Sequence, residues 1–331
     1  MDTGRNFAEI AGMVRAWLSI FVLLPGLLAA QREGEPLRAV TDRLTTLYNG
    51  GKYDSLFVLF APGMQAALPQ EKAAAFFSGL QAQAGKILSR EPIEVGETHA
   101  LYKTVFDRLV LALRISIDDK GRISGLYVRR YTDSRLPELA RNKTPMRLPF
   151  DGKWFVVWGG DDRERNRHAD FPPQRYAFDF VVVGEDGKSY RNDGRSNADY
   201  AAYGRPVLAP CDGIVVQAVD GVRDNIPGET NPAYAPGNSV LLKTDSSEYL
   251  LLAHLQPRSL RVAEGDRVRR GDVLGLCGNS GNSTEPHIHF HIQNGENLQV
   301  SQGAKCYFGH IVVNGVTRSD YSSVKGEQVE P

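Results

Sequence analysis

The chain has 331 residues, enough for about two domains, and its 42% hydrophobic content is ordinary for a globular protein. Its 39 basic and 39 acidic side chains cancel, so no basic excess exists to neutralise phosphates, and we expect no nucleic-acid partner.

The first 30 residues predict a secretory signal peptide. Arg5 and Arg15 precede a short apolar run over 16–24, and small residues lead to Ala30 before a polar segment. This order of charged, apolar and small residues is typical of a signal cleaved near Ala30. An uncleaved anchor is the alternative, but the run is short for a bilayer span. Since no later run is long enough to span, we expect a mature protein without a membrane span, exported to the periplasm or the extracellular space.

Residues 36–130 predict a small α+β domain. Two helical patterns come first and two alternating strand patterns follow, over residues 37–48, 69–84, 109–117 and 123–128. The segment Asn49-Gly50-Gly51 ends the first helical pattern. Helices followed by an antiparallel sheet resemble the nuclear-transport-factor-like cone domains that precede hydrolase domains in exported bacterial proteins. No catalytic constellation is evident in this segment, and its role stays open.

Residues 131–147 predict a linker, since prolines interrupt regular structure there. From 148 to 313 we expect a mainly antiparallel β domain, because short apolar runs alternate with Gly, Pro, Asn and Asp. The runs that predict strands lie at 155–158, 178–183, 213–216, 240–242 and 249–252. Residues 314–331 form a polar tail, which we expect to be frayed from about Ser319.

Three of the seven histidines lie in one strand-like segment, Glu285-Pro286-His287-Ile288-His289-Phe290-His291. Because side chains alternate along a strand, His287, His289 and His291 are expected to point to one side. Imidazole is the commonest side-chain ligand for zinc. The alternative is a surface strand that exposes polar histidines on its wet face.

Three further polar residues stand out in the β region. Asp179 lies between aromatic residues in an apolar strand, where a carboxylate is costly unless it is paired or binds metal. His254 interrupts another apolar run, and His168 lies upstream. Each residue alone is more simply a satisfied structural side chain. Together, an Asp and two His with an open coordination position indicate a catalytic zinc site.

Residues from about 150 to 313 resemble the lysostaphin-type (LytM-like) zinc metallopeptidases of bacterial cell walls. The resemblance lies in the strand around Asp179, in Leu252-Ala253-His254-Leu255 and in the segment from Gly278 to Phe290, which occur in the family's order. It implies that Asp179 and His289 are zinc ligands, and that His254 and His287 are catalytic.

The first metal ligand departs from the family pattern. The family commonly has a His four residues before the Asp, but Arg175 occupies that position here. His168 lies eleven residues before Asp179, across Pro172-Pro173, and we assign it to the metal on the expectation that a looped excursion returns its imidazole.

The resemblance implies an endopeptidase that cleaves stem peptides or cross-links of bacterial peptidoglycan. Zinc would polarise the scissile carbonyl and lower the pKa of its bound water to roughly 7. His254 and His287 would move protons and stabilise the developing charge. For His291 three roles stay open, namely support of the ligand, a substrate contact, or an exposed side chain, and we favour the last.

Two other functions share parts of this framework. A catalytically inactive relative that binds the cell wall or activates another hydrolase predicts missing ligands, yet only the first ligand departs from the pattern. The hairpin from Gly265 to Gly275 also resembles biotinyl and lipoyl carrier domains, but it lacks the Lys that a carrier needs. The endopeptidase is therefore the favoured function.

The three cysteines, Cys211, Cys277 and Cys306, do not form a paired ligand pattern. In an oxidising compartment they are compatible with one disulfide and one free thiol. Three buried thiols in apolar surroundings are an equal alternative.

Overall fold

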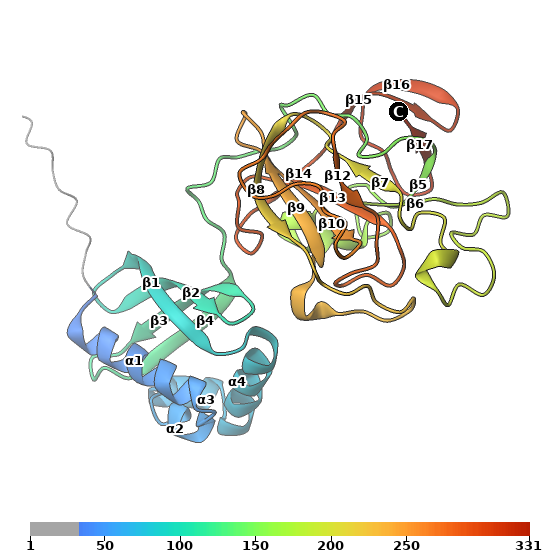
Figure 1. Ribbon diagram of the computed structural model, residues 1–331. Coiled ribbons are helices and arrows are strands. Elements are labelled where there is room, and N and C mark those ends of the chain that lie inside the picture. Colours follow the sequence, from blue (N-terminus) through green and yellow to red (C-terminus); the bar gives the residue numbers. More distant parts are fainter. Residues whose placement is uncertain (1–32) are drawn as a thin grey trace, which may run out of the picture.

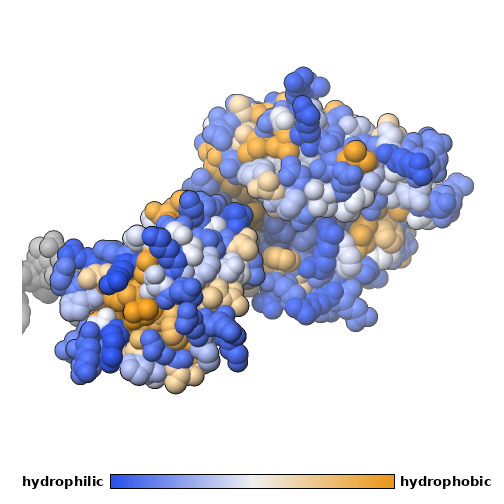
Figure 2. Space-filling view, turned by 90° about the horizontal axis from the view of Figure 1, so that it is seen from below, coloured by the Kyte–Doolittle hydropathy of each residue, from blue (hydrophilic) through white to orange (hydrophobic). Residues whose placement is uncertain are grey.

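The computed structural model describes residues 33–331, which form two domains joined by an irregular segment (Figure 1). The predicted signal peptide, 1–30, lies outside the described residues. Within the part of the chain that is described, no helix combines the length and apolarity that crossing a membrane requires. In Figure 2 the two domains appear as two adjoining lobes; blue hydrophilic atoms cover much of the visible face, and orange hydrophobic atoms gather on the smaller lobe.

The N-terminal domain contains helices followed by an antiparallel sheet, as predicted. The helices are α1 (Glu35–Asn49), α2 (Tyr53–Phe57), α3 (Pro62–Ala67) and α4 (Gln70–Ala84), of which the two short ones were not predicted. The strands are β1 (Ile87–Val95), β2 (His99–Phe106), β3 (Val110–Ile117) and β4 (Ile123–Arg130), paired in chain order. Leu37, Leu44 and Tyr48 on α1 share one core with Phe77 and Ile115. Their spacing of three, four and seven residues places the apolar face of α1 toward the sheet.

The C-terminal domain contains an 11-stranded sheet in the order β11-β8-β9-β10-β13-β6-β5-β17-β15-β16, with β14 paired to β13. Its strands are β5 (Trp154–Trp158), β6 (Phe178–Val181), β8 (Gly213–Val219), β9 (Asn238–Lys243), β10 (Tyr249–Leu255), β11 (Arg267–Val268), β13 (Ile288–Gln293), β14 (Gly303–Ala304), β15 (Phe308–Val313), β16 (Val316–Tyr321) and β17 (Gln328–Glu330). Two more strands, β7 (Pro206–Leu208) and β12 (Val273–Leu276), form a separate pair. All of these pairings are antiparallel, which confirms the predicted class.

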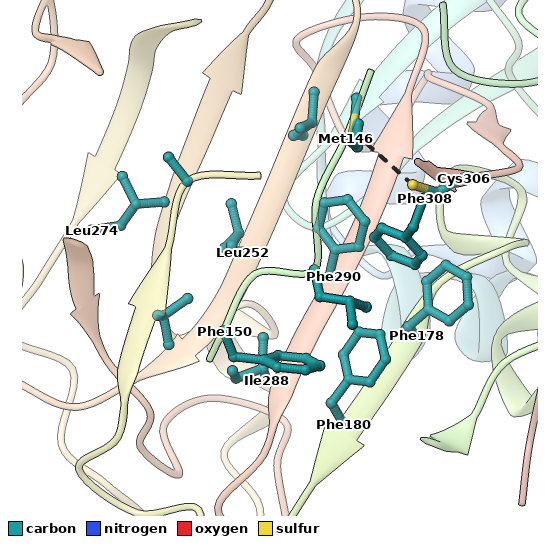
Figure 3. Close-up of a cluster of buried hydrophobic side chains, with 14 of the residues drawn as sticks. Met146, Phe150, Phe178, Phe180, Leu252, Leu274, Ile288, Phe290, Cys306 and Phe308 are labelled. Carbon is teal, nitrogen blue, oxygen red and sulfur yellow. Dashed lines mark hydrogen bonds between the residues drawn. The ribbon is translucent and has the colours of Figure 1, made fainter. Parts of the chain in front are cut away.

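The two faces of β13 have different surroundings. Ile288, Phe290 and Ile292 point into the main apolar core, where Phe290 lies among Phe178 and Phe308 (Figure 3). Because successive side chains alternate, the odd-numbered residues of β13 face the opposite side of the sheet. The apolar core therefore fixes which face carries the histidines.

The segment from 314 to 331 is not a frayed tail, so that prediction is wrong. It forms β16 and β17, and Val329 at the centre of β17 is fully buried between Val313 and Trp154. The outer strand β16 is exposed along nearly its whole length, which explains its polar sequence. An edge hairpin with one solvent-exposed strand can have the polar composition of a disordered tail, although its strands are paired.

The segment predicted as a linker, 131–147, lacks helices and strands but is packed at both ends. Tyr131 joins a small apolar cluster that also holds Val110 of the N-terminal domain and Val300 of the C-terminal domain. Met146 is buried in the core of the C-terminal domain. The two domains therefore touch through this cluster, and Gln299 Nε2 donates a hydrogen bond to the Arg108 carbonyl at 3.2 Å.

All three cysteines are buried free thiols. Cys277 and Cys306 lie in the main core, as does Cys211, so the structure agrees with the alternative of three apolar buried thiols.

Candidate metal and catalytic site

The register of two strands brings Asp179 and His289 together. In the antiparallel pair of β6 and β13, Asp179 lies directly opposite His289. The imidazole Nδ1 of His289 is 2.8 Å from Oδ1 of Asp179, and both side chains are buried. Cross-strand partners share one face of a sheet, so the pairing itself positions this nitrogen beside the carboxylate.

His168 reaches the same carboxylate from outside the sheet. It lies in the short 3-10 helix η1 (Arg167–Asp170), and its Nε2 is 3.0 Å from Oδ2 of Asp179. Arg175, the residue at the usual ligand position, is exposed. The structure therefore contains the looped excursion that was expected to return His168 toward Asp179.

A buried asparagine holds this excursion in place, and it was missed in the sequence. Asn166 accepts a hydrogen bond from the His168 backbone N–H at 3.0 Å, and its amide donates to the carbonyls of Gly160 and Ala177, each at 3.0 Å. Its position as the N-cap of η1 is the signal that could have identified it.

His168, Asp179 and His289 together fit a metal ion. They offer one ligand atom each, and these atoms lie within 4.8 Å of one another. Two imidazole nitrogens and one carboxylate oxygen form a donor set that suits zinc and leaves an open coordination position. Arg167 also approaches this carboxylate, with a guanidinium nitrogen 3.2 Å from Oδ2 of Asp179.

The electrostatics of Asp179 favour its charged form. Burial alone would raise the pKa of this carboxyl, but the imidazoles of His168 and His287 and the hydrogen bond from His168 hold it well below its usual range. A carboxylate that stays ionised inside a buried site can serve as a metal ligand.

His254 enters the site from the end of β10, where the strand bulges. The residue has a left-handed backbone with φ of 65°, an uncommon conformation for a residue with a Cβ that costs of order 1–3 kcal/mol. Its backbone N–H donates to the Pro236 carbonyl at 3.0 Å, and its Nδ1 lies 2.8 Å from the Ser280 carbonyl. Since a carbonyl only accepts, Nδ1 carries the proton and Nε2 is left as a base.

The environment keeps His254 neutral. Burial, followed by the neighbouring imidazoles of His287 and His289, holds the pKa of His254 well below its ordinary value. The centroid of its ring is 4.7 Å from that of His287. Two imidazoles are thus adjacent at the edge of the metal-ligand cluster.

His287 lies immediately before β13 rather than on the strand, and one of its nitrogens faces the site. Its Nδ1 is 2.8 Å from the Glu285 carbonyl and 3.1 Å from Oγ of Ser283. Its buried Nε2 has no hydrogen-bond partner among residues 33–331 and lies 3.6 Å from Oδ1 of Asp179. An unpartnered buried nitrogen is costly, so this geometry favours an additional ligand at the site.

His291 is not an exposed side chain, and that prediction is wrong. It is 1% exposed, although it lies on the face of β13 opposite the main apolar core. Its Nδ1 is 2.9 Å from Nε2 of His289, and its Nε2 is 3.0 Å from Oε1 of Gln293. Gln293 was missed in the sequence, although it continues the same alternating series of polar residues.

Residues 195–301 match Peptidase family M23, and residues 42–126 match a family described as a protein of unknown function (DUF3887). The first match includes His254, His287 and His289. His168 and Asp179 precede it.

Similar proteins cover part of this chain. Glycyl-glycine endopeptidase ALE-1 of Staphylococcus capitis is 38% identical over 88 residues, 26% of this chain and 21% of that protein. Peptidoglycan DD-endopeptidase ShyA of Vibrio cholerae is 33% identical over 181 residues, 54% of this chain and 34% of that protein. The matched segments are thus 21% and 34% of these relatives' own lengths. Among solved structures, the catalytic domain of lysostaphin from Staphylococcus simulans is 21% identical with a TM-score of 0.28, covering 45% of this chain and 86% of that one.

Proposed function

Because residues 195–301 match Peptidase family M23, we propose that the protein is a zinc-dependent endopeptidase. His168, Asp179 and His289 would hold the zinc, and His254 and His287 would be catalytic. The observation that carries the proposal is the position of Asp179, whose two oxygens face His168 Nε2 at 3.0 Å and His289 Nδ1 at 2.8 Å. This carboxylate and two nitrogens form a donor set of the zinc-peptidase type.

When bound, zinc supplies a Lewis acid for the scissile carbonyl and acidifies a water molecule. His254 accepts the proton of the attacking water at Nε2, since its Nδ1–H is engaged by the Ser280 carbonyl. That carbonyl also stabilises the imidazolium that forms, because it accepts a charge-assisted hydrogen bond. The proton then passes to the leaving amine, which completes hydrolysis of the peptide bond.

His287 would accept a proton at Nε2 and relay it to the leaving group, and in that protonated form it would stabilise the oxygen of the tetrahedral intermediate. Its Nδ1 is held beside the Glu285 carbonyl, so its unpartnered Nε2 is directed by the backbone toward the space beside Asp179. A group fixed before the reaction requires little reorganisation when charge develops.

We place the substrate in bacterial peptidoglycan, in either its stem peptides or its cross-links. The names of the two relatives support this, since one is a glycyl-glycine endopeptidase and the other a peptidoglycan DD-endopeptidase. These names describe different bonds, so the proposal remains at the level of a peptidoglycan peptide. Such a substrate requires export, in agreement with the signal peptide predicted for residues 1–30.

A catalytically inactive relative that binds or activates is not supported, because it predicts missing ligands, whereas His168 offers a first ligand although Arg175 occupies the usual position. The test is to incubate the mature protein with purified muropeptides of defined cross-link type and to identify the products by mass. The zinc content of the same preparation is measured by metal analysis. Products that gain one water at a peptide bond, lost after zinc removal and restored by zinc, are expected. Cleavage that survives complete zinc removal, or in the His289→Ala variant, would reject the metallopeptidase.

A further inference from the structure

A buried row of hydrogen-bonding groups runs along β13, away from the candidate metal site. It comprises His289, His291 and Gln293, which alternate on one face of the strand. We propose that His291 and Gln293 are positioning residues that fix the tautomer of His289 and thereby direct its Nδ1 lone pair at the metal. This inference rests on the proposed function and concerns two residues to which that function assigned no role.

Gln293, at the end of the row away from the candidate metal site, determines which groups in the row donate hydrogen bonds and which accept them. The Gln293 amide nitrogen lies 2.7 Å from the Gly295 carbonyl and 3.2 Å from the Glu296 carbonyl. Both amide hydrogens therefore have acceptors, and a flipped amide would place its oxygen against two carbonyl oxygens. Gln293 Oε1 is consequently an acceptor that faces His291.

Each neutral imidazole has one N–H. The acceptor on Gln293 therefore determines which nitrogen of His291 is protonated, and His291 in turn determines which nitrogen of His289 is protonated. His291 must donate from Nε2 to Gln293 Oε1, which leaves its Nδ1 as an acceptor. His289 then donates from Nε2 to that Nδ1, and its own Nδ1 has no proton. The opposite tautomers would leave Gln293 Oε1 facing a nitrogen lone pair.

The outcome at the metal site is a pair of acceptors. His289 Nδ1 and Asp179 Oδ1 are 2.8 Å apart, and neither has a proton to share when the row is in this state. A cation between the lone pairs removes this repulsion. The row therefore disfavours a simple His–Asp hydrogen bond and favours metal ligation through Nδ1.

The sheet makes the row stiff. His291 lies opposite Leu251 and Gln293 lies opposite Tyr249 in the pairing with β10. His289, His291 and Gln293 are all buried, so water cannot replace a lost partner without a rearrangement. Hydrogen-bond partners of metal-ligating histidines typically contribute 10–100-fold in metal affinity or activity.

The test compares three variants of the mature protein. His291→Leu removes the Nδ1 acceptor and the Nε2–H donor of that imidazole. His291→Asn keeps an oxygen near the Nδ1 position. Gln293→Met removes the Oε1 acceptor at the end of the row. Leu251→Val is the matched control, because it alters the packing directly opposite His291 without removing a hydrogen bond.

Two measurements are made on each protein. Long-range nitrogen–proton NMR of the ¹⁵N-histidine-labelled, metal-free protein reports which nitrogen of His289 is protonated. Competition with a chromogenic chelator gives the zinc dissociation constant.

We expect the Nε2–H tautomer in the wild type, in His291→Asn and in Leu251→Val. In His291→Leu we expect an Nδ1–H population and zinc binding weakened about 10–100-fold, with a smaller loss of the same sign in Gln293→Met.

Wild-type tautomer and zinc affinity in both His291→Leu and Gln293→Met would overturn the inference. A wild type whose His289 carries its proton on Nδ1 in the metal-free state would also overturn it. If the wild type shows the Nε2–H tautomer but binds no zinc, the proposed function fails while the role of the row in fixing the tautomer stands. The two failures are therefore distinguishable.

Discussion

Asp179 and His289 are direct cross-strand partners, and this single pair ties the candidate site to the register of the sheet. A slip of one residue between β6 and β13 would turn His289 into the apolar core and separate its Nδ1 from the carboxylate. Phe290 and Phe178, which are also partners in this register, oppose such a slip because both are buried in the core. The apolar face thus positions the polar one.

The first ligand can be tested by a matched pair of alanine variants. Mutating a hydrogen-bond partner of a metal ligand typically weakens metal binding roughly 10–100-fold. We expect His168→Ala, which removes a ligand itself, to weaken zinc binding by more than this. Arg175→Ala should leave zinc affinity near the wild-type value, since that side chain is exposed. Chelator competition measures both. If Arg175→Ala weakened zinc binding more than His168→Ala, the first ligand would be assigned to position 175, which would contradict the role of His168.

His254 is expected to separate catalysis from metal binding. The His254→Ala variant should retain stoichiometric zinc while kcat for peptide hydrolysis falls roughly 10²–10⁴-fold, the usual contribution of a general acid–base group. The neighbouring metal-ligand cluster does not require its side chain. Metal analysis and product formation on a single muropeptide are measured on the same sample. Loss of zinc in this variant would instead assign His254 a structural role at the metal site.

The site was predictable from the sequence where strand alternation decides the geometry. His289 and His291 are two residues apart in a strand, so they were expected to share one face. Burying the carboxylate of Asp179 is costly, which indicated that it needs partners. Spacing within one strand could not show that Ser280 would face His254, because that contact depends on how a loop 26 residues away folds back. His291 was misassigned for a similar reason, since alternation fixes a side but not what covers it.

The closing hairpin offers a test of the fold. Val329 is fully buried, whereas Val316 on the edge strand is 52% exposed. Val329→Ala should lower the free energy of unfolding by about 2 kcal/mol, from two lost methylene-sized groups and a residual cavity. Val316→Ala should change it by less than about 0.5 kcal/mol. Denaturant unfolding followed by tryptophan fluorescence reports both, and equal effects would mean that β17 is not packed as described.

The buried histidines predict that the metal-free protein loses stability in acid. Burial lowers the pKa of His289 to about 4 and that of His291 to about 3, against an ordinary value of 6.5. Because the folded pKa values are depressed, the unfolded chain binds more protons below pH 6.5. Their stabilisation is therefore present above 6.5 and is lost as the pH falls toward 4 and 3. Each imidazole contributes a slope of up to about 1.4 kcal/mol per pH unit in this window.

Urea unfolding of the chelator-treated protein at pH 7, 6 and 5 measures this effect. The unfolding midpoint should fall steadily with pH, because His254 also has a depressed pKa. The fall should be shallower in His291→Asn, which removes one of these titrating imidazoles. Asp179 does not contribute above pH 5, since its pKa is held below its ordinary value of 3.8. A midpoint that is constant from pH 7 to 5 would mean that these imidazoles are hydrated in solution, which contradicts the closed, buried row along β13.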